Sequence, residues 1–189
     1  MAEASGGRLR TVLSVPNQLT FLRLAFLPFL LISIRYERYG WALVVLAAAG
    51  ASDALDGLLA RQLGQKTAVG AYLDPIADKL LLSSSFFMLA LESKIRWWLA
   101  ILVLGRDVLL LTAAVVIVLA AGYVSLPPSF WGKLTTAFQI LMVFLVIVLA
   151  LHESRFLRLA RDGCAWVVAG FTVFSGLHYS VTVARRLSQ

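Results

Sequence analysis

Four aspartates are the most concentrated chemical feature of the sequence. They are Asp53, Asp56, Asp74 and Asp78, and they make up four of the six aspartates in the chain. The residues around them are mostly apolar and belong to stretches long enough to enter a bilayer, where a carboxylate is costly and marks a functional site by default. The members of each pair are three or four residues apart, so on a helix each pair lies on one face.

The two pairs are also expected at one depth. Asp53 lies eight residues before Arg61, where one predicted helix leaves the membrane, and Asp78 lies eight residues after Gly70, where the next helix enters. At ~1.5 Å per residue both lie about 12 Å from the same surface. Four adjacent carboxylates need cations to remain ionised, and oxygen ligands suit Mg²⁺, Mn²⁺ or Ca²⁺ better than zinc. The spacing predicts a metal site; the alternative is a structural role in capping or helix–helix hydrogen bonding.

Composition places the chain among polytopic membrane proteins. Its 189 residues are 60% hydrophobic and 14% charged, with a mean hydropathy of +0.86, and a soluble domain of this size could not bury so much apolar surface. The net charge of +7 is explained by contact with anionic membrane lipids. Nucleic-acid binding is not expected, because the basic residues form no continuous stripe. The single cysteine, Cys164, excludes an intrachain disulfide.

The expected fold class is all-α, with six transmembrane helices. Residues 1–14 form a short, polar, basic N-terminal segment, and residues 15–187 form a single six-helix transmembrane catalytic domain. The hydrophobic stretches and turn signals place the six predicted spans at about 17–34, 40–61, 70–91, 97–121, 131–151 and 163–184. The segment HESRFLRLARD, 152–162, is interpreted as a basic connector between the last two spans.

The distribution of positive charge leaves the orientation in the membrane open. Six spans put both termini on one side, which is also the side of the aspartates. That side carries seven Lys and Arg residues, and the opposite side also carries seven, so the excess of positive charge that normally marks the cytoplasmic side is missing. The seven on the opposite side are Arg35, Arg38, Lys94, Arg96, Arg155, Arg158 and Arg161.

The aspartates belong to a longer pattern with fixed spacing. Written in full, this pattern is Asp53-x2-Asp56-Gly57-x2-Ala60-Arg61-x8-Gly70-x3-Asp74-x3-Asp78. At every position it resembles the signature of the CDP-alcohol phosphatidyltransferases. Asn17, Thr20 and Arg23, each three residues from the next, are similar to the usual opening of the first span in that family, and six spans are its usual number.

The resemblance implies an enzyme that transfers a phosphatidyl group from CDP-diacylglycerol to an alcohol and releases CMP, with Mg²⁺ or Mn²⁺ as cofactor. By resemblance, the metal ligands are Asp53, Asp56, Asp74 and Asp78, and Asp78 is also the catalytic base that takes the proton of the attacking hydroxyl. A divalent metal suits a pyrophosphate donor because it stabilises the charge on the leaving phosphate. The resemblance also implies a homodimer in the membrane, a prokaryotic cell membrane as its location and a site that faces the cytoplasm.

The remaining motif positions are expected to bind the CDP-lipid together with Asp53, Asp56 and Asp74. These positions are Asn17, Thr20, Gly57, Ala60, Arg61 and Gly70. The small residues allow the nucleotide to approach the helix backbone, and the fork of donors on arginine suits phosphate oxygens. Each has a simpler alternative: the small residues suit helix packing, Arg61 could mark a membrane boundary, and Asn17 or Thr20 could cap the first span.

Two cations outside the motif are candidates for binding the acceptor alcohol. Arg106 lies deep in the fourth span and needs a partner; neighbouring Asp107 is expected to point about 100° away from it on a helix. That partner is either a substrate phosphate or a structural ion pair with another span. Lys133 lies at the start of the fifth span, on the side of the aspartates, where it could instead reach lipid phosphate.

The identity of the acceptor is less strongly indicated than the reaction. The segment GKLTTAFQ, 132–139, resembles the phosphatidylglycerophosphate synthases, whose acceptor is glycerol 3-phosphate, and this is the preferred interpretation. Thr135 and Asp107 stand where those enzymes usually have Lys and Glu, and the further Arg of their fourth span is absent. These departures resemble the cardiolipin synthases, whose acceptor is phosphatidylglycerol. A metal-ion or proton-coupled transporter is a remote alternative of another class, which would distribute its carboxylates across the membrane.

Overall fold

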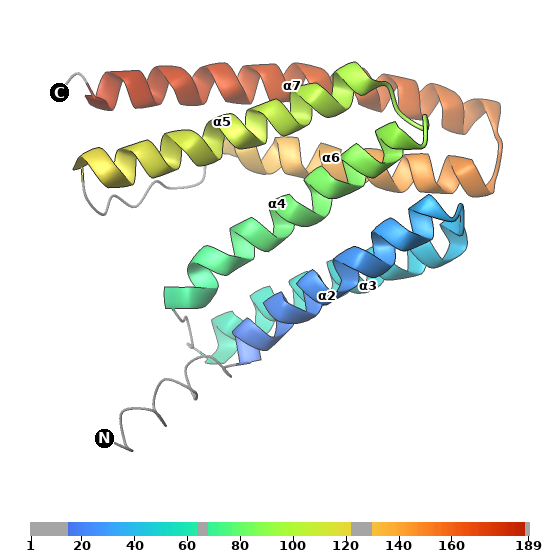
Figure 1. The fold of residues 1–189 in the computed structure, drawn as a ribbon, viewed down its shortest axis with the longest axis horizontal. Helices are drawn as coiled ribbons and strands as arrows, with labels where there is room; N and C mark the ends of the chain where they lie inside the picture. Colours follow the sequence, from blue (N-terminus) through green and yellow to red (C-terminus); the bar gives the residue numbers. More distant parts are fainter. Residues whose placement is uncertain (1–14, 64–67, 122–129, 188–189) are drawn as a thin grey trace. The chain divides into compact units, whose positions relative to one another are not determined.

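The computed structural model describes the backbone of residues 15–63, 68–121 and 130–187, and the side chains of residues 22–52, 77–113 and 130–179. Within those ranges the chain forms six helices and no strand (Figure 1). The helices are α2 (Val15–Arg35), α3 (Tyr39–Leu63), α4 (Ala68–Leu91), α5 (Trp97–Ala121), α6 (Phe130–Leu151) and α7 (Arg155–Leu187). The all-α prediction is confirmed.

Only some of the described helical segments are long and apolar enough to indicate a membrane span. Among the residues with described side chains, α6 is long and apolar enough to cross a bilayer, and Tyr39–Ser52 in α3 is a shorter apolar stretch. The helices match the six predicted spans within a few residues, except at the start of α7. Six membrane crossings therefore stay a prediction.

The predicted basic connector is mostly helical, so this part of the prediction is wrong. The connection between α6 and α7 is only residues 152–154, and α7 begins at Arg155 rather than near residue 163. The segment RFLRLARD consists mainly of Arg, Leu and Ala, which are strong helix formers, and it contains no Gly or Pro. Its charges limit how deeply it can enter a membrane, but they do not prevent it from being helical.

The chain divides into two compact units, residues 1–85 and residues 86–189. In the first unit α2 packs along α3. Leu30 and Ile34 of α2 are fully buried, as is Ala42 of α3, while Ala49 of α3 is nearly so. Alanine on the inner face of α3 allows the two helix backbones to approach closely, which strengthens van der Waals packing between apolar helices.

In the second unit α7 packs against both α5 and α6. Aromatic rings join α6 to α7: Phe138 stacks on Phe171 with a centroid distance of 5.2 Å, and Trp131 meets Phe174 edge to face at 4.9 Å. Ile147 of α6 is fully buried. Aromatic pairs therefore join α6 to α7, and α6 also contributes a buried aliphatic side chain to the core of this unit.

The turn between α2 and α3 closes α2 with a Schellman motif. Glu37 has a positive φ of 56°. Its amide donates to Ile34 O at 3.0 Å, and the amide of Arg38 donates to Ser33 O at 2.8 Å. These two bonds satisfy carbonyls at the end of α2 that have no partner within the helix. The position usually holds glycine, so the non-glycine residue here is held in a less favourable conformation.

The turn after α4 repeats the same geometry. Ser93 has a φ of 55°. The amide of Ser93 donates to Ala90 O at 3.0 Å, and the amide of Lys94 donates to Leu89 O at 2.9 Å. The chain therefore leaves α4 along a defined path, and α5 begins three residues after Lys94 at Trp97.

The α6–α7 packing predicts a difference between two isoleucines on the same helix. Ile147→Ala is expected to destabilise the protein by about 2 kcal/mol, because it leaves a cavity in a closely packed core. Ile140→Ala is the matched control; Ile140 is 47% exposed, and its loss is expected to have little effect. Thermal unfolding in detergent micelles measures both, and equal melting temperatures would contradict the packing described.

Candidate active site

The motif residues lie on the helices expected to carry them. Asp53, Asp56, Gly57, Ala60 and Arg61 lie in the last eleven residues of α3. Because the backbone there is helical, the three-residue spacing puts Asp53 and Asp56 on one face. Their side chains lie outside the described residues.

The second half of the motif lies on α4. Gly70, Asp74 and Asp78 fall within its first eleven residues, so Asp74 and Asp78, four apart, also share a helix face. Of these three, only the side chain of Asp78 is described. Asn17 and Thr20 lie in the first two turns of α2, and their side chains are likewise outside the described part.

Asp78 is held by an ion pair from another helix. Arg23 Nη1 of α2 donates to Asp78 Oδ1 of α4. The Arg23 side chain is only 2% exposed, whereas that of Asp78 is 42% exposed. The guanidinium is thus buried behind the carboxylate, which remains accessible from its other side. The pair joins α2 to α4 and orients the carboxylate, since the planar fork of arginine fixes direction as well as charge.

The partner of Asp78, Arg23, was not predicted from the sequence, although an arginine within an apolar span indicates a buried ion pair. The sequence pattern places Arg23 in the opening of the first span with Asn17 and Thr20 and assigns it no partner. An arginine within an apolar span requires a partner, and Arg23 lies six residues inside the first predicted span, which begins at about residue 17. Its pairing with a motif aspartate could have been proposed on that ground alone.

The donor set suits a hard divalent cation. Four carboxylates, with no His or Cys among them, match the oxygen preference of Mg²⁺ and Mn²⁺. Where side chains are described, no group of three or more His, Cys, Asp or Glu residues is found; three of the four aspartates lie outside those ranges. The accessible carboxylate of Asp78 is compatible with metal binding.

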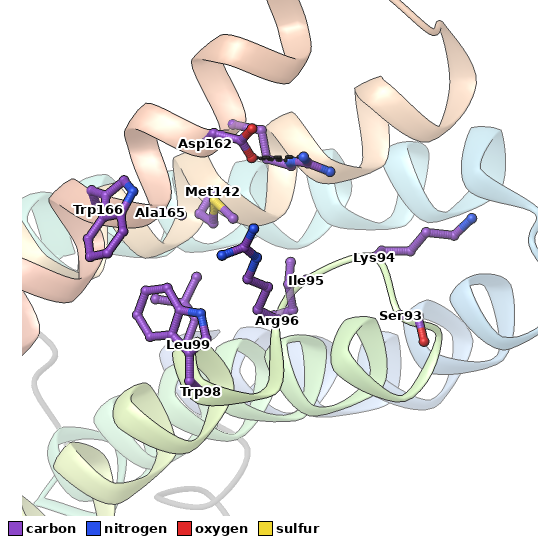
Figure 2. A pocket seen from close by; sticks show the side chains of 11 residues that line it. Ser93, Lys94, Ile95, Arg96, Trp98, Leu99, Met142, Asp162, Ala165 and Trp166 are labelled. Atoms are coloured by element: carbon purple, nitrogen blue, oxygen red, sulfur yellow. Dashed lines mark hydrogen bonds and ion pairs between the residues drawn. The ribbon is translucent and has the colours of Figure 1, made fainter.

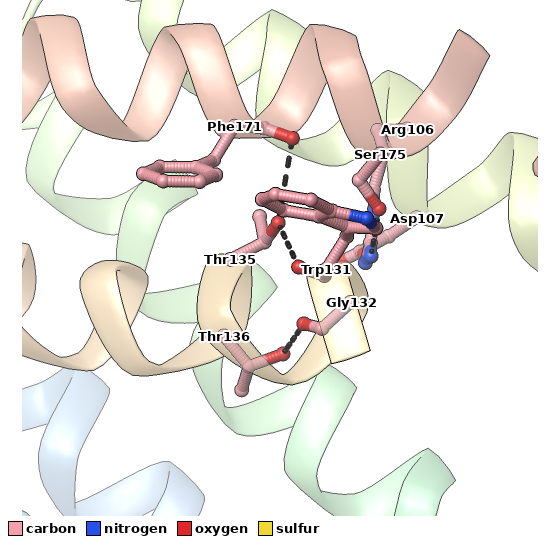
Figure 3. Close-up of polar contacts among 8 residues, drawn as sticks. All are labelled: Arg106, Asp107, Trp131, Gly132, Thr135, Thr136, Phe171 and Ser175. Atoms are coloured by element: carbon pink, nitrogen blue, oxygen red, sulfur yellow. Dashed lines mark hydrogen bonds and ion pairs between the residues drawn. The ribbon is translucent and has the colours of Figure 1, made fainter. Parts of the chain in front are cut away.

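Arg106 has a different environment from the one predicted. Its Nη1 donates to Asp107 Oδ1 at 2.8 Å, and its Nη2 donates to Ser175 Oγ of α7 at 3.0 Å (Figure 3). Both members of the ion pair are buried, with Arg106 8% and Asp107 5% exposed. The prediction that Asp107 points away is wrong, because the long arginine side chain folds back to reach its neighbour although their Cβ directions differ by about 100°.

The other acceptor candidate, Lys133, and the nearby Thr135 both lie on the first turns of α6. Thr135 is fully buried, and its Oγ1 donates to Trp131 O at 2.8 Å (Figure 3). Phe171 O of α7 lies 3.4 Å from the same hydroxyl. Lys133 is exposed. Lys133 and Arg106 lie on different helices, α6 and α5, and a shared role in binding an acceptor stays a prediction.

The comparison with protein families supports the resemblance over most of the chain. Residues 13–176 match the family model of the CDP-alcohol phosphatidyltransferases. The chain belongs to this family. It is therefore a transferase, and its family is membrane-associated in bacteria and generally dependent on divalent metal.

Relatives within the CDP-alcohol phosphatidyltransferase family carry two kinds of name. A cardiolipin synthase (CMP-forming) of Streptomyces coelicolor is 36% identical over 169 residues, which cover 86% of this chain and 73% of that protein. A "Probable phosphatidylglycerophosphate synthase" of Mycobacterium tuberculosis is 35% identical over 189 residues, covering 96% of this chain and 85% of the relative. A CDP-diacylglycerol–glycerol-3-phosphate 3-phosphatidyltransferase of Aquifex aeolicus is 34% identical over 155 residues, which cover 79% of this chain and 84% of that protein.

The Arg23–Asp78 pair predicts a graded series of effects. Arg23→Gln is expected to destabilise the protein by about 2 kcal/mol, because a carboxylate loses its cation. It is also expected to lower transferase turnover by about tenfold or more, because Asp78 is no longer held in one orientation. Arg23→Lys keeps the charge without the fork and should give an intermediate turnover.

The matched control is Arg35→Gln, which removes an exposed arginine from the last turn of the same helix. Thermal unfolding and turnover are measured side by side for all three variants. If Arg23→Gln behaves like Arg35→Gln in both measurements, the ion pair neither stabilises the fold nor orients Asp78.

Proposed function

We propose that the chain is a phosphatidyltransferase with one six-span catalytic domain over residues 15–187, preceded by the short polar segment 1–14. It transfers the phosphatidyl group of CDP-diacylglycerol to glycerol 3-phosphate and releases CMP. The observation that carries this proposal is the complete aspartate motif, within a family match that covers residues 13–176.

In this proposal, Asp53, Asp56, Asp74 and Asp78 hold Mg²⁺ or Mn²⁺. When bound, such a metal neutralises the pyrophosphate of the donor and stabilises the phosphate of the leaving CMP. Gly57, Ala60 and Gly70 leave space for the nucleotide beside the helix backbone. Arg61, Asn17 and Thr20 bind polar groups of the CDP-lipid.

Asp78 acts as the general base. It takes the proton of the acceptor hydroxyl, whose oxygen then forms a bond to the phosphorus on the diacylglycerol side. The bond from that phosphorus to the bridging oxygen breaks, and CMP leaves with both electrons of that bond. Arg23 supports this step by orienting the carboxylate of Asp78 toward its accessible side.

The preferred acceptor is glycerol 3-phosphate. Relatives named for this product or reaction match the chain over 96% and 79% of its length. Arg106 and Lys133 are the candidate acceptor-binding cations. Within the described residues, the buried Arg106 Nε has no hydrogen-bond partner, so the guanidinium retains one unsatisfied donor.

Phosphatidylglycerol is the second candidate acceptor, and a specific observation favours it. Asp107 neutralises Arg106 in a buried ion pair, so this position contributes less positive charge for a doubly charged, water-soluble phosphate. Thr135 is uncharged and contributes none; it is buried, with its hydroxyl bonded to Trp131 O. A cardiolipin synthase is also among the relatives, at 36% identity.

The wider setting follows from the family resemblance. The enzyme is an integral, multi-pass membrane protein of a prokaryotic cell membrane, its site faces the cytoplasm, and it functions as a homodimer. Its partners are CDP-diacylglycerol, the acceptor alcohol and membrane lipids.

The acceptor can be tested by CMP release from CDP-diacylglycerol by purified protein with Mg²⁺ or Mn²⁺. Parallel reactions contain glycerol 3-phosphate, phosphatidylglycerol, serine, inositol phosphate or no acceptor. Release only with glycerol 3-phosphate is the expected result. Release only with phosphatidylglycerol would make the protein a cardiolipin synthase, and no release from folded protein with any acceptor would contradict the proposed transfer.

The base role of Asp78 predicts a loss of turnover without unfolding. Asp78→Asn removes the proton acceptor while keeping the size of the side chain, and is expected to lower CMP release by about 100-fold or more. Glu37→Gln makes the same chemical change at an exposed turn and is expected to keep full activity. Turnover by Asp78→Asn comparable to that of Glu37→Gln would remove Asp78 from this role.

A further inference from the structure

Two adjoining cavities lie in the second unit, between the turn that follows α4 and the first turns of α7. The larger has a volume of about 360 Å³ and the smaller about 280 Å³. Ser93, Lys94 and Arg161 line both. We call the larger one the Arg96 cavity, defined by Lys94, Arg96, Trp98, Arg161, Asp162 and Trp166.

Positive charge predominates in the Arg96 cavity. Three cations and one carboxylate line it, which leaves two positive charges in excess. The carboxylate of Asp162 already bonds Arg161, at 2.9 Å from Nε and 2.7 Å from Nη2. Within the described part of the chain the Arg96 side chain makes no hydrogen bond or ion pair, and its guanidinium extends into the middle of the cavity (Figure 2). The guanidinium of Arg96 could therefore donate hydrogen bonds to an anion without first breaking another interaction.

The start of α5 adds to this potential. The helix begins at Trp97, directly after Arg96, and runs for 25 residues. The first amides of a helix lack carbonyl partners within it and form its positive end. Arg96 and Trp98, in the first turn of α5, both line the cavity, so the positive end of the helix lies beside it, and the planar guanidinium suits two oxygens of a phosphate.

The other walls are apolar and aromatic. Trp98 and Trp166 lie with ring centroids 5.5 Å apart and are 38% and 69% exposed, while Leu99 and Met142 lie beside them (Figure 2). Exposed tryptophans are typical of the level where lipid headgroups meet acyl chains. A free phosphate would use only the cationic part of the cavity, whereas a phospholipid would use both parts.

We propose that the Arg96 cavity binds the phosphate of an anionic phospholipid, with Lys94, Arg96 and Arg161 on the headgroup and Trp98 and Trp166 beside the glycerol and upper acyl chains. This binding site is distinct from the aspartate motif. Lys94 follows Asp78 by sixteen residues, and the predicted six-span topology assigns the two residues to opposite sides of the membrane. The inference requires a membrane-embedded protein, but it does not depend on which alcohol accepts the phosphatidyl group.

The test measures stabilisation of purified protein in detergent micelles by soluble, short-chain dihexanoyl phosphatidylserine. This anionic lipid is neither substrate nor product of either proposed reaction, so its binding is separable from catalysis. Melting temperature is followed against lipid concentration, with dihexanoyl phosphatidylcholine as the zwitterionic lipid and inorganic phosphate as the free anion. The proposal expects stabilisation by phosphatidylserine at concentrations where the other two have little effect.

Arg96→Gln is the test variant and Arg155→Gln the matched control. Both remove one exposed arginine from the same predicted side of the membrane, but Arg155 lines neither cavity. The apparent affinity for phosphatidylserine is expected to fall about fivefold or more in Arg96→Gln, the effect of one basic residue at an anionic headgroup, and to stay within about twofold in Arg155→Gln.

Three results would overturn the proposal. Equal weakening in both variants would show a diffuse charge effect rather than a binding site. Stabilisation by inorganic phosphate at the same concentrations as phosphatidylserine would assign the cavity to a free anion. Stabilisation by phosphatidylserine that is unchanged in Arg96→Gln would place the bound lipid elsewhere, and because Arg96 is exposed, misfolding of this variant is not expected to obscure the result.

Discussion

A charged side chain among apolar helices must have a partner, and much of the polar structure of this protein follows from that requirement. Arg23 is almost completely buried and is paired with Asp78 on another helix. Arg106 is buried as well, and it is held by Asp107 beside it and by Ser175 on α7. In each case a guanidinium joins two helices through directional bonds, which apolar packing alone does not supply. The first contact thereby fixes α2 relative to α4, and the second fixes α5 relative to α7.

The Arg23–Asp78 pair combines structural and chemical roles in one contact. Its arginine side is sealed from solvent, while its carboxylate side is open. Such a one-sided environment allows a carboxylate to be held rigidly and still meet a substrate. Functional sites in membranes commonly retain costly charges for this reason. The same pair explains why α2, which contributes few motif residues, matters for a site centred on α3 and α4.

Most helices could be predicted from the sequence because long apolar stretches end at clear turn signals, such as the Pro-Pro segment before α6. The start of α7 could not, because 155–162 is charged yet made of helix formers, and hydropathy reports burial in lipid rather than backbone conformation. The Arg106–Asp107 pair was missed for a related reason. Helical geometry gives the direction of Cβ, but the reach of an arginine side chain decides where its charge lies.

The aspartate motif could be predicted from the sequence because it is defined by residue types and their spacing along two helices. The identity of the acceptor is harder to predict, since glycerol 3-phosphate and phosphatidylglycerol both attack the same donor through a primary hydroxyl of glycerol. In the proposed site, discrimination between them would depend on a few positions, among them the charged pair Arg106–Asp107 and the uncharged Thr135. Relatives named for either reaction are about equally similar to the chain, so overall identity does not separate the two.

The two Schellman turns have a practical consequence for mapping the topology of the protein with inserted reporter domains. At Ser93 a left-handed residue and two backbone bonds guide the chain from α4 to α5, and the next residues contribute Lys94 and Arg96 to a cationic cavity. A reporter fused into this connection would open the end of α4 and displace both cations. The connection at residues 152–154 has no positive-φ residue in the structure described. An insertion there would lengthen a simple link between α6 and α7, and in the predicted six-span topology it would report on the same side of the membrane.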